Sequence, residues 1–277
     1  DTNVPAPNAQ VTYMLEGQNV GTFPFYRGAR PDANVNRILM LQSVVESKYN
    51  ALVLAANKRF SDGLLFNVHY TLGKSTDNGQ NSTTFFASFN QTYDPLNRTL
   101  AMEGPSDFDR RHRFVGSLYY RPAYLYGIGV STIITAESGF PITANISGSI
   151  PAATGAVNTA TTNGSGGANL APWLGRNSER QNGRKTVDLR ASKQFGVGGG
   201  RNVEVLWEVF NLFNWVNYTG ASNTAFNVAA TPAATYDAAT NTATVNLTRN
   251  TGFLVPTTIG NTLYGMRDMQ FGLKFSW

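Results

Sequence analysis

The sequence predicts an all-β protein: an antiparallel, up-and-down β-barrel of the outer-membrane type, with about eight strands, short periplasmic turns and long outer loops. The clearest observation lies at the C-terminal end. Every odd position from Met269 to Trp277 is apolar, and every even position from Asp268 to Ser276 is polar or glycine. A period of two puts these sets on opposite faces of a strand. A membrane barrel requires such strands, because one face meets lipid and the other the polar lumen.

Composition supports the same fold class. Only 14% of the 277 residues are charged, against roughly 25% in ordinary soluble domains. Apolar residues make up 42%, which argues against disorder. No apolar run reaches the ~20 residues of a transmembrane helix. The chain has no cysteine, which excludes disulfides and thiolate chemistry. Because it begins at Asp1 without a signal peptide, we expect a processed chain or a fragment.

The predicted strands are each near the ~9–11 residues that a tilted barrel strand requires, and they differ in how clearly they alternate. Residues 36–45 form a nearly continuous apolar run, and residues 50–60 alternate weakly. Residues 64–73, 110–121, 126–136, 185–195 and 201–214 alternate more clearly, and residues 266–277 most clearly. The expected apolar faces of the five middle strands are Leu64, Phe66, Val68 and Tyr70; Phe114, Leu118 and Tyr120; Ile128, Val130 and Ile134; Val187, Leu189 and Ala191; and Val203, Val205, Trp207 and Val209. We therefore expect a barrel over residues 36–277 and an N-terminal extended segment over residues 1–35.

The lengths of the connections are a third observation. Barrels of this class alternate short periplasmic turns with long outer loops. The expected turns are residues 61–63, 122–125 and 196–200, and the expected loops are residues 74–109, 137–184 and 215–265. Long and short alternate through these six connections, and only the link 46–49 is short on the long-loop side.

Several segments, in their order along the chain, are similar to one family. They are Ser47-Lys-Tyr-Asn-Ala-Leu-Val-Leu, Lys58-Arg-Phe-Ser-Asp-Gly-Leu, Tyr70-Thr-Leu-Gly-Lys-Ser, Ser106-Asp-Phe-Asp-Arg-Arg-His-Arg-Phe, Glu137-Ser-Gly-Phe-Pro, Glu208-Val-Phe-Asn-Leu-Phe-Asn and the closing strand from Met266. This set resembles the carboxypeptidase-regulatory-like, Oar-type TonB-dependent receptors of acidobacteria. The resemblance implies the last third or so of a barrel of about 22 strands, and a role in nutrient uptake or surface binding. The family's plug and TonB-contacting box have no counterpart in this sequence, so we expect that the chain is not an autonomous transporter.

The densest polar cluster lies between residues 107 and 113. Its candidate residues are Asp107, Asp109, Arg110, Arg111 and Arg113, with a histidine among them. These side chains include a carboxylate, a base and an oxyanion stabiliser, the parts of an enzyme site. The resemblance instead implies a rim cluster at the outer end of a strand, where paired charges hold a loop to the barrel. We expect the rim role.

Two further sets of residues follow from the strand faces. Charges of both signs on one face of neighbouring strands predict a polar network in the lumen, rather than the paired carboxylates of a glycosidase. Its members are Asp188, Arg190, Glu204, Glu208, Asp268 and Lys274. Aromatic residues near predicted strand ends are typical of the girdles at membrane interfaces, although ordinary sheets also contain them. These residues are Trp207, Tyr120, Tyr126, Phe271, Phe275 and Trp277.

The sequence predicts no enzyme, no cofactor and no nucleic-acid partner. With two separated histidines and no cysteine, we do not expect a transition-metal site. We expect a location in the outer membrane of a Gram-negative bacterium, in contact with lipid or lipopolysaccharide. The expected protein partner is another copy or the remaining part of a larger receptor. The alternative is a self-assembling subunit of an extracellular filament or tube built from a receptor-derived small barrel, in which residues 11–15 are a candidate donor strand.

Overall fold

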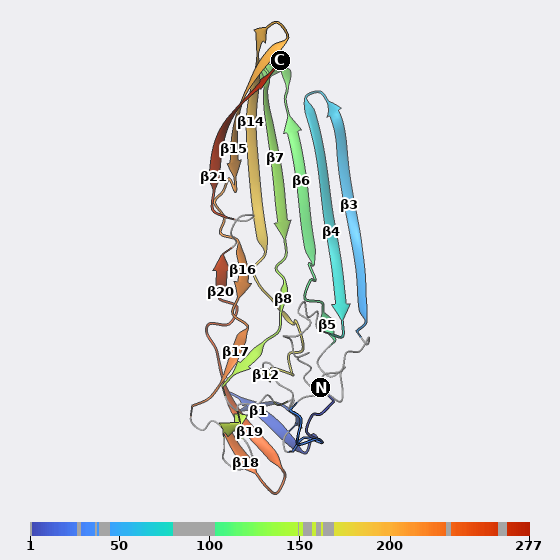
Figure 1. The fold of residues 1–277 in the computed structure, drawn as a ribbon, viewed down its shortest axis with the longest axis vertical. Coiled ribbons are helices and arrows are strands. Elements are labelled where there is room, and N and C mark those ends of the chain that lie inside the picture. Colours follow the sequence, from blue (N-terminus) through green and yellow to red (C-terminus); the bar gives the residue numbers. More distant parts are fainter. Residues whose placement is uncertain are drawn as a thin grey trace.

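The computed structural model describes residues 2–26, 29–36, 38, 45–79, 103–148, 150–151, 157–158, 162, 169–230, 234–259 and 265–277. They form an elongated molecule in which two β-sheets follow one another along the long axis (Figure 1). We call them the spanning sheet, which contains the long strands, and the outer sheet, which is built from the connections between those strands and from the N-terminal segment.

The spanning sheet is a meander of seven long strands, each antiparallel to the next. In chain order these strands are β3 (Ser47–Ser61), β4 (Leu64–Asp77), β6 (His112–Tyr120), β7 (Ile128–Glu137), β14 (Arg184–Gly198), β15 (Arg201–Phe210) and β21 (Asp268–Ser276). The two-residue strand β5 (Gly104–Pro105) pairs with the end of β4. The predicted all-β, up-and-down antiparallel fold is confirmed.

Short turns join the long strands at one end of the spanning sheet, which we call the turn end. Asp62 and Gly63 have φ of 53° and 77°, and Gly199 and Gly200 have φ of 61° and 77°. A two-residue type I′ hairpin needs positive φ at both positions, which Asp-Gly and Gly-Gly adopt readily. The third short connection contains the 3-10 turn η1 (Ala123–Leu125). The long connections all leave the opposite end, the loop end.

The first predicted strand, residues 36–45, lies mostly outside the described residues. The predicted link 46–49 is wrong, because β3 already begins at Ser47 and continues to Ser61. The alternation in residues 47–49 is weak, since Ser, Lys and Tyr are all amphiphilic or polar, and only the pairing with β4 defines this part of the strand.

Two other strand ends differ from their predicted positions because a residue there adopts the left-handed backbone conformation. Tyr126, predicted to begin a strand, has φ of 50° and caps η1, so β7 begins at Ile128. The predicted strand 201–214 ends at Phe210, because Asn211 has φ of 52°. The Asn211 side chain then stabilises the turn by accepting the Trp215 amide at 3.0 Å. Asparagine tolerates this conformation better than most residues.

The outer sheet has seven strands, in parts of the chain where the sequence predicts only connections and an extended N-terminal segment. They are β1 (Ala9–Leu15), β2 (Gln18–Phe25), β9 (Asn145–Ser147), β12 (Asn169–Leu170), β17 (Thr224–Val228), β18 (Ala234–Asp237) and β19 (Thr242–Arg249). The order across the sheet is β12-β9-β17-β19-β1-β2, with β18 also paired to β19. The N-terminal segment thus forms a hairpin, and its strand β1 lies parallel to β19.

The hydrophobic core lies in the outer sheet and not between the long strands. Val11, Tyr13 and Val245 are fully buried there, on strands whose alternate residues face inward. The Tyr13 ring packs 5.2 Å from that of Trp173 and 6.3 Å from that of Phe23. Further two-stranded pairs surround the core or join it to the spanning sheet: β8 (Pro141–Ile142) with β13 (Glu179–Arg180), β10 (Ile150–Pro151) with β11 (Val157–Asn158), and β16 (Tyr218–Ala221) with β20 (Pro256–Ile259).

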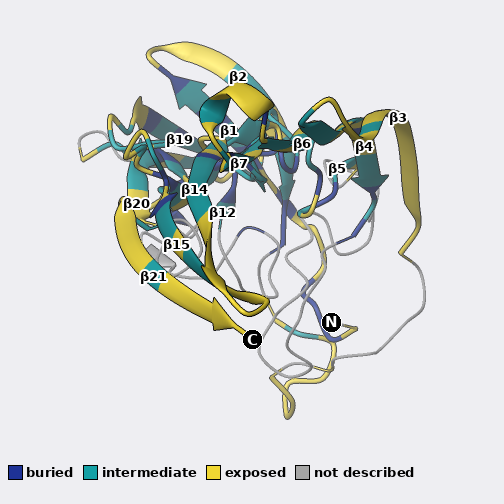
Figure 2. Cartoon of the chain, turned by 90° about the horizontal axis from the view of Figure 1, so that it is seen from above, coloured by how far each residue is buried: buried dark blue, intermediate teal, exposed yellow. Residues whose placement is uncertain are grey.

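The spanning sheet has two edge strands, β3 and β21. Within the described part of the chain, β3 pairs only with β4, and β21 only with β15. Seen from above, the strands follow an arc that stays open between β3 and β21, and both edge strands are mostly exposed (Figure 2). Because neighbours alternate in direction, the first and seventh strands run the same way. In the described ranges, no helix is long and apolar enough to cross a membrane.

Candidate functional site

The register of the spanning sheet separates an apolar face from a polar one. Trp207 lies opposite Phe271 on the apolar face, and Arg190 lies opposite Glu208 on the other. Phe271 and Leu273 are 81% and 78% exposed, as expected of side chains that meet lipid. We call these two surfaces the lipid face and the lumen face.

The predicted girdle residues separate into two groups. Tyr120, Tyr126, Phe275 and Trp277 lie at the turn end, where the Phe275 and Trp277 ring centroids are 5.7 Å apart. The Tyr120 hydroxyl is 2.8 Å from that of Tyr124 in the adjoining turn. Trp207 and Phe271 instead pair with each other nearer the loop end. The aromatic side chains therefore lie at two levels of the lipid face.

Four of the six predicted lumenal residues gather on the lumen face. Arg190 Nη2 lies 3.5 Å from Glu204 Oε1, and its Nη1 lies 3.7 Å from Glu208 Oε1. Gln270 Nε2 donates to Glu208 Oε2 at 2.5 Å. Lys274 lies opposite Glu204 in the neighbouring strand. One guanidinium thus contacts two carboxylates, with Lys274 opposite one of them, and the resulting network is an ion-pair ladder and not an isolated pair of carboxylates.

The other two predicted lumenal residues bind backbone at the loop end. Asp188 Oδ1 accepts the amide of Asn211 at 2.8 Å, which stabilises the turn after β15. Asp268 Oδ1 accepts the amide of Met269, also at 2.8 Å, at the start of β21. The Asp188 carboxylate thus fixes the turn that follows β15, and the Asp268 carboxylate binds the backbone at the start of β21.

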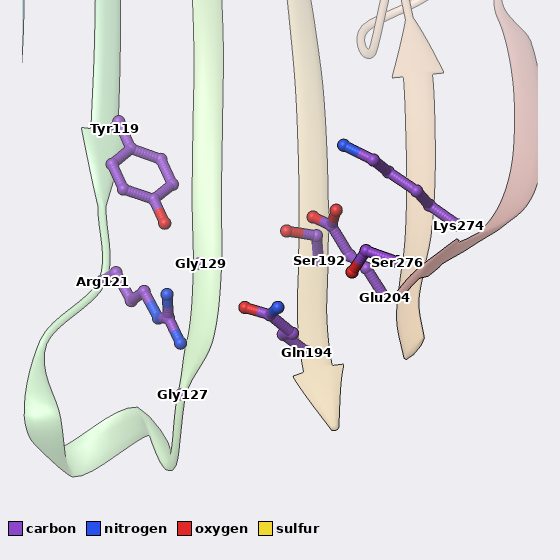
Figure 3. A pocket seen from close by; sticks show the side chains of 9 residues that line it. All are labelled: Tyr119, Arg121, Gly127, Gly129, Ser192, Gln194, Glu204, Lys274 and Ser276. Atoms are coloured by element: carbon purple, nitrogen blue, oxygen red, sulfur yellow. The ribbon is translucent and has the colours of Figure 1, made fainter. Parts of the chain in front are cut away.

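A polar hollow of about 250 Å³ lies on the lumen face at the turn end (Figure 3). Gly129 makes room for it, because a Cβ at that position would lie 2.8 Å from the Tyr119 hydroxyl. Figure 3 shows Tyr119 and Arg121 on one side, facing residues of the last strands on the other. Its lining is Tyr119, Arg121, Gly127, Gly129, Ser192, Gln194, Glu204, Lys274 and Ser276. Such a surface favours water and hydrophilic solutes over apolar ones.

The rim cluster lies at the loop end, and Asp109 is its most buried member, at 1% exposure. Its carboxylate pairs with the Arg180 guanidinium. Arg180 Nη1 also donates to the carbonyls of Asp109 at 3.0 Å and of Gly139 at 3.2 Å. Asp109 Oδ1 accepts the Ser75 amide at 2.5 Å. One carboxylate thus joins strand β4 to two different outer connections.

Asp107 belongs to a second part of the rim cluster. Its Oδ1 accepts Asn177 Nδ2 at 2.6 Å and Arg176 Nη1 at 3.2 Å. Arg176 also forms an ion pair with Asp77 at the end of β4, and both side chains are at most 2% exposed. Asn177 adopts a φ of 56° and donates to the Pro105 carbonyl at 2.8 Å. The connection around Arg176 is therefore fixed to the end of the spanning sheet.

Arg110 and Arg113 converge on Glu137, the last residue of β7. Arg110 Nη1 and Arg184 Nη2 lie 2.9 Å and 2.6 Å from Glu137 Oε1, and Arg113 Nε lies 4.0 Å from Oε2. The Arg110 guanidinium also lies 3.8 Å from the centre of the Phe140 ring. The remaining predicted rim residue, Arg111, contributes its carbonyl oxygen, which accepts the Gly73 amide at 3.0 Å.

Sequence reasoning missed half of this network. The missed residues are Asp77, Glu137, Arg176, Asn177, Arg180 and Arg184. One signal was present: residues 176–180 place three charged side chains in a connection otherwise rich in Ala, Gly and Asn. Among the described residues, no group of three or more His, Cys, Asp or Glu side chains is arranged to hold a metal ion.

A family model described as an outer membrane beta barrel domain matches residues 1–252. No curated protein matches the sequence.

Proposed function

The chain belongs to the family of outer membrane beta barrel domains, and we propose that it is the C-terminal section of a larger barrel of the TonB-dependent receptor type. It is located in the outer membrane, which it crosses with β-strands. In the proposed role the chain forms part of a barrel wall around a polar passage, and it takes part in uptake or surface binding only together with further strands and a plug.

Two edges of the spanning sheet carry this proposal: among the described residues, neither β3 nor β21 has a second partner strand. In hydrocarbon, backbone polar groups must be satisfied within the protein, so a membrane sheet has to close. β3 and β21 run in the same direction, and a wholly antiparallel barrel can join them only through an odd number of added strands. Bacterial single-chain barrels have an even number of strands. Seven strands within a barrel of about 22 leave an odd number to be added.

The lumen face fits a wall and not a catalyst. Its carboxylates Glu204 and Glu208 both lie beside Arg190, in an ion-pair ladder of the kind that lines a barrel wall. The polar hollow at the turn end and the ion-pair ladder give a hydrophilic surface opposite the lipid face. We therefore propose that the chain is not an enzyme and binds no cofactor.

Hydrogen exchange on the purified chain in detergent micelles tests the proposal. The amides of β3 that point away from β4, and those of β21 that point away from β15, should exchange much faster than the amides of the central strands β7 and β14. Native mass spectrometry of the same sample should give a monomer. Slow exchange at both edges of a monomer would refute the proposal, because the chain would then close by itself, with residues 36–45 as an eighth strand.

A second candidate function is a self-assembling structural subunit, and the same exposed edges favour it. An unpaired strand is a template for pairing with another chain, and β3 is exposed along almost its whole length. If identical copies lay in a membrane in one orientation, β21 of one copy would pair in parallel with β3 of the next. Outer-membrane barrels instead pair their strands antiparallel. Detergent-free fibres with slow exchange at both edges would select this function over the receptor section.

A further inference from the structure

We propose that the lumen face carries a binding site for a small soluble oxyanion, a carboxylate or phosphate compound with a flat apolar part, at its loop end. A hollow of about 560 Å³ lies there, within the roughly 300–1,000 Å³ of small-molecule sites. Its lining consists of Tyr49, Thr71, Ser75, Phe108, Arg110, Arg113, Glu137 and Arg184.

The strand register places the centre of this hollow on the side away from lipid. Thr71 pairs with Arg113, Arg113 with Glu137, and Glu137 with Arg184, in one row across β4, β6, β7 and β14. Arg184 and Arg190 are an even number of residues apart on β14, so this row shares the lumen face with the ion-pair ladder. A ligand therefore reaches the row from solution, and lipid headgroups lie on the opposite face.

The hollow has an excess of positive charge. Three arginines and one glutamate line it, which leaves a formal charge of +2. Glu137 Oε1 lies 2.9 Å from Arg110 Nη1 and 2.6 Å from Arg184 Nη2. Arg110 Nη1 also donates to the Ser138 carbonyl at 2.9 Å. These contacts hold two guanidinium groups in place before a ligand arrives.

Arg113 is the residue that remains available to a ligand. Its Nε lies 4.0 Å from Glu137 Oε2, beyond hydrogen-bond distance, and its side chain is 62% exposed, against 15% for Arg110 and 17% for Arg184. A guanidinium binds carboxylate and phosphate through two parallel N–H donors. The rings of Tyr49 and Phe108, 65% and 61% exposed, provide apolar surfaces for a flat ligand.

Binding of two probes to the full chain in non-ionic detergent tests this inference by calorimetry. The probes are phthalate, a flat dicarboxylate, and inorganic pyrophosphate. Arg113→Gln should weaken binding about tenfold or more, because it removes charge-assisted hydrogen bonds. Arg113→Lys should retain part of the affinity, since the charge stays and the fork is lost. Arg201→Gln, at the turn end, is the matched control and should bind as the wild type does.

Saturable binding that weakens with salt and with Arg113→Gln supports the site. Tighter binding of phthalate than of pyrophosphate supports the aromatic surfaces as part of it, and equal binding removes the flat apolar part from the proposal. Absence of saturable binding, or equal affinity of the Arg113→Gln variant with an unchanged circular dichroism spectrum, overturns it. The inference rests on the proposed function only in placing the hollow inside a barrel. The edge-strand exchange test and the binding test therefore fail independently.

Discussion

Arg176→Met should be among the most destabilising single substitutions at the junction of the two sheets. The Arg176 and Asp77 side chains are 1% and 2% exposed. Without the guanidinium, the Asp77 carboxylate stays buried with an uncompensated charge, and the 3.2 Å contact to Asp107 is lost as well. Removal of one partner from a buried ion pair costs about 3–5 kcal/mol. Urea unfolding of the micelle-embedded chain, followed by tryptophan fluorescence, measures this loss.

The double variant Asp77→Asn/Arg176→Met separates a buried charge from simple loss of packing. The side-chain carbonyl at position 77 is then neutral and still accepts a hydrogen bond from the Gly79 backbone N–H, which donates to Asp77 Oδ1 at 3.2 Å in the wild type. The double variant should therefore recover about 2 kcal/mol or more of the loss, because buried pairs replaced as a whole cost little. A single variant less than about 1 kcal/mol below the wild type would refute the reasoning, and so would a double variant no more stable than the single one.

Three other predictions concern the core of the outer sheet and the two faces of the spanning sheet. Tyr13→Ala should cost about 3–5 kcal/mol, as for other buried aromatic residues, and limited proteolysis should then cut β1 and β19 while the amides of the central strands β7 and β14 stay protected from hydrogen exchange. Burial raises the pKa of the Tyr13 phenol above its ordinary value. Above about pH 10 the folded state keeps a proton that the unfolded state loses, so the free energy of unfolding should fall as pH rises. Urea unfolding at pH 9 and pH 11 should show this fall in the wild type and a smaller one in Tyr13→Phe. Phe271 lies near the middle of β21 on the lipid face, where a charge is costly, so Phe271→Arg should reduce stability in lipid by about 2–4 kcal/mol. Gln270→Arg, on the lumen face, should have a small effect when both variants are compared by urea unfolding in lipid vesicles.

The spanning sheet could be predicted from the sequence because one constraint determines the alternation of residues along its strands. Lipid on one side and a polar lumen on the other impose a period of two, which is visible directly in residues 201–210 and 268–276. Strand ends were less predictable, since they depend on single backbone conformations such as those of Tyr126 and Asn211. The predicted strand 36–45 lies mostly outside the described residues and stays a prediction.

The outer sheet was not predicted from the sequence, for a different reason. Ala243, Val245 and Leu247 alternate with polar residues as clearly as many spanning strands do. The alternation of long and short connections nevertheless places these residues inside the predicted loop 215–265. Pairing between distant segments, such as β1 with β19, leaves no local trace in a single sequence. The rim network was half predicted for the same reason: the run 107–113 stands out, but its partners come from separate connections.

The parallel pairing of β1 and β19 has a consequence for the order in which the molecule assembles. The Asn241 side chain donates to the carbonyl of Asn8, 233 residues earlier in the chain. The core of the outer sheet needs both segments, so it can form only after each has been delivered to the same side of the membrane. Closing so long a loop is slow and entropically costly. We therefore expect completion of the outer sheet to be a late step of assembly, and β1 and β19 to become protease-resistant only then.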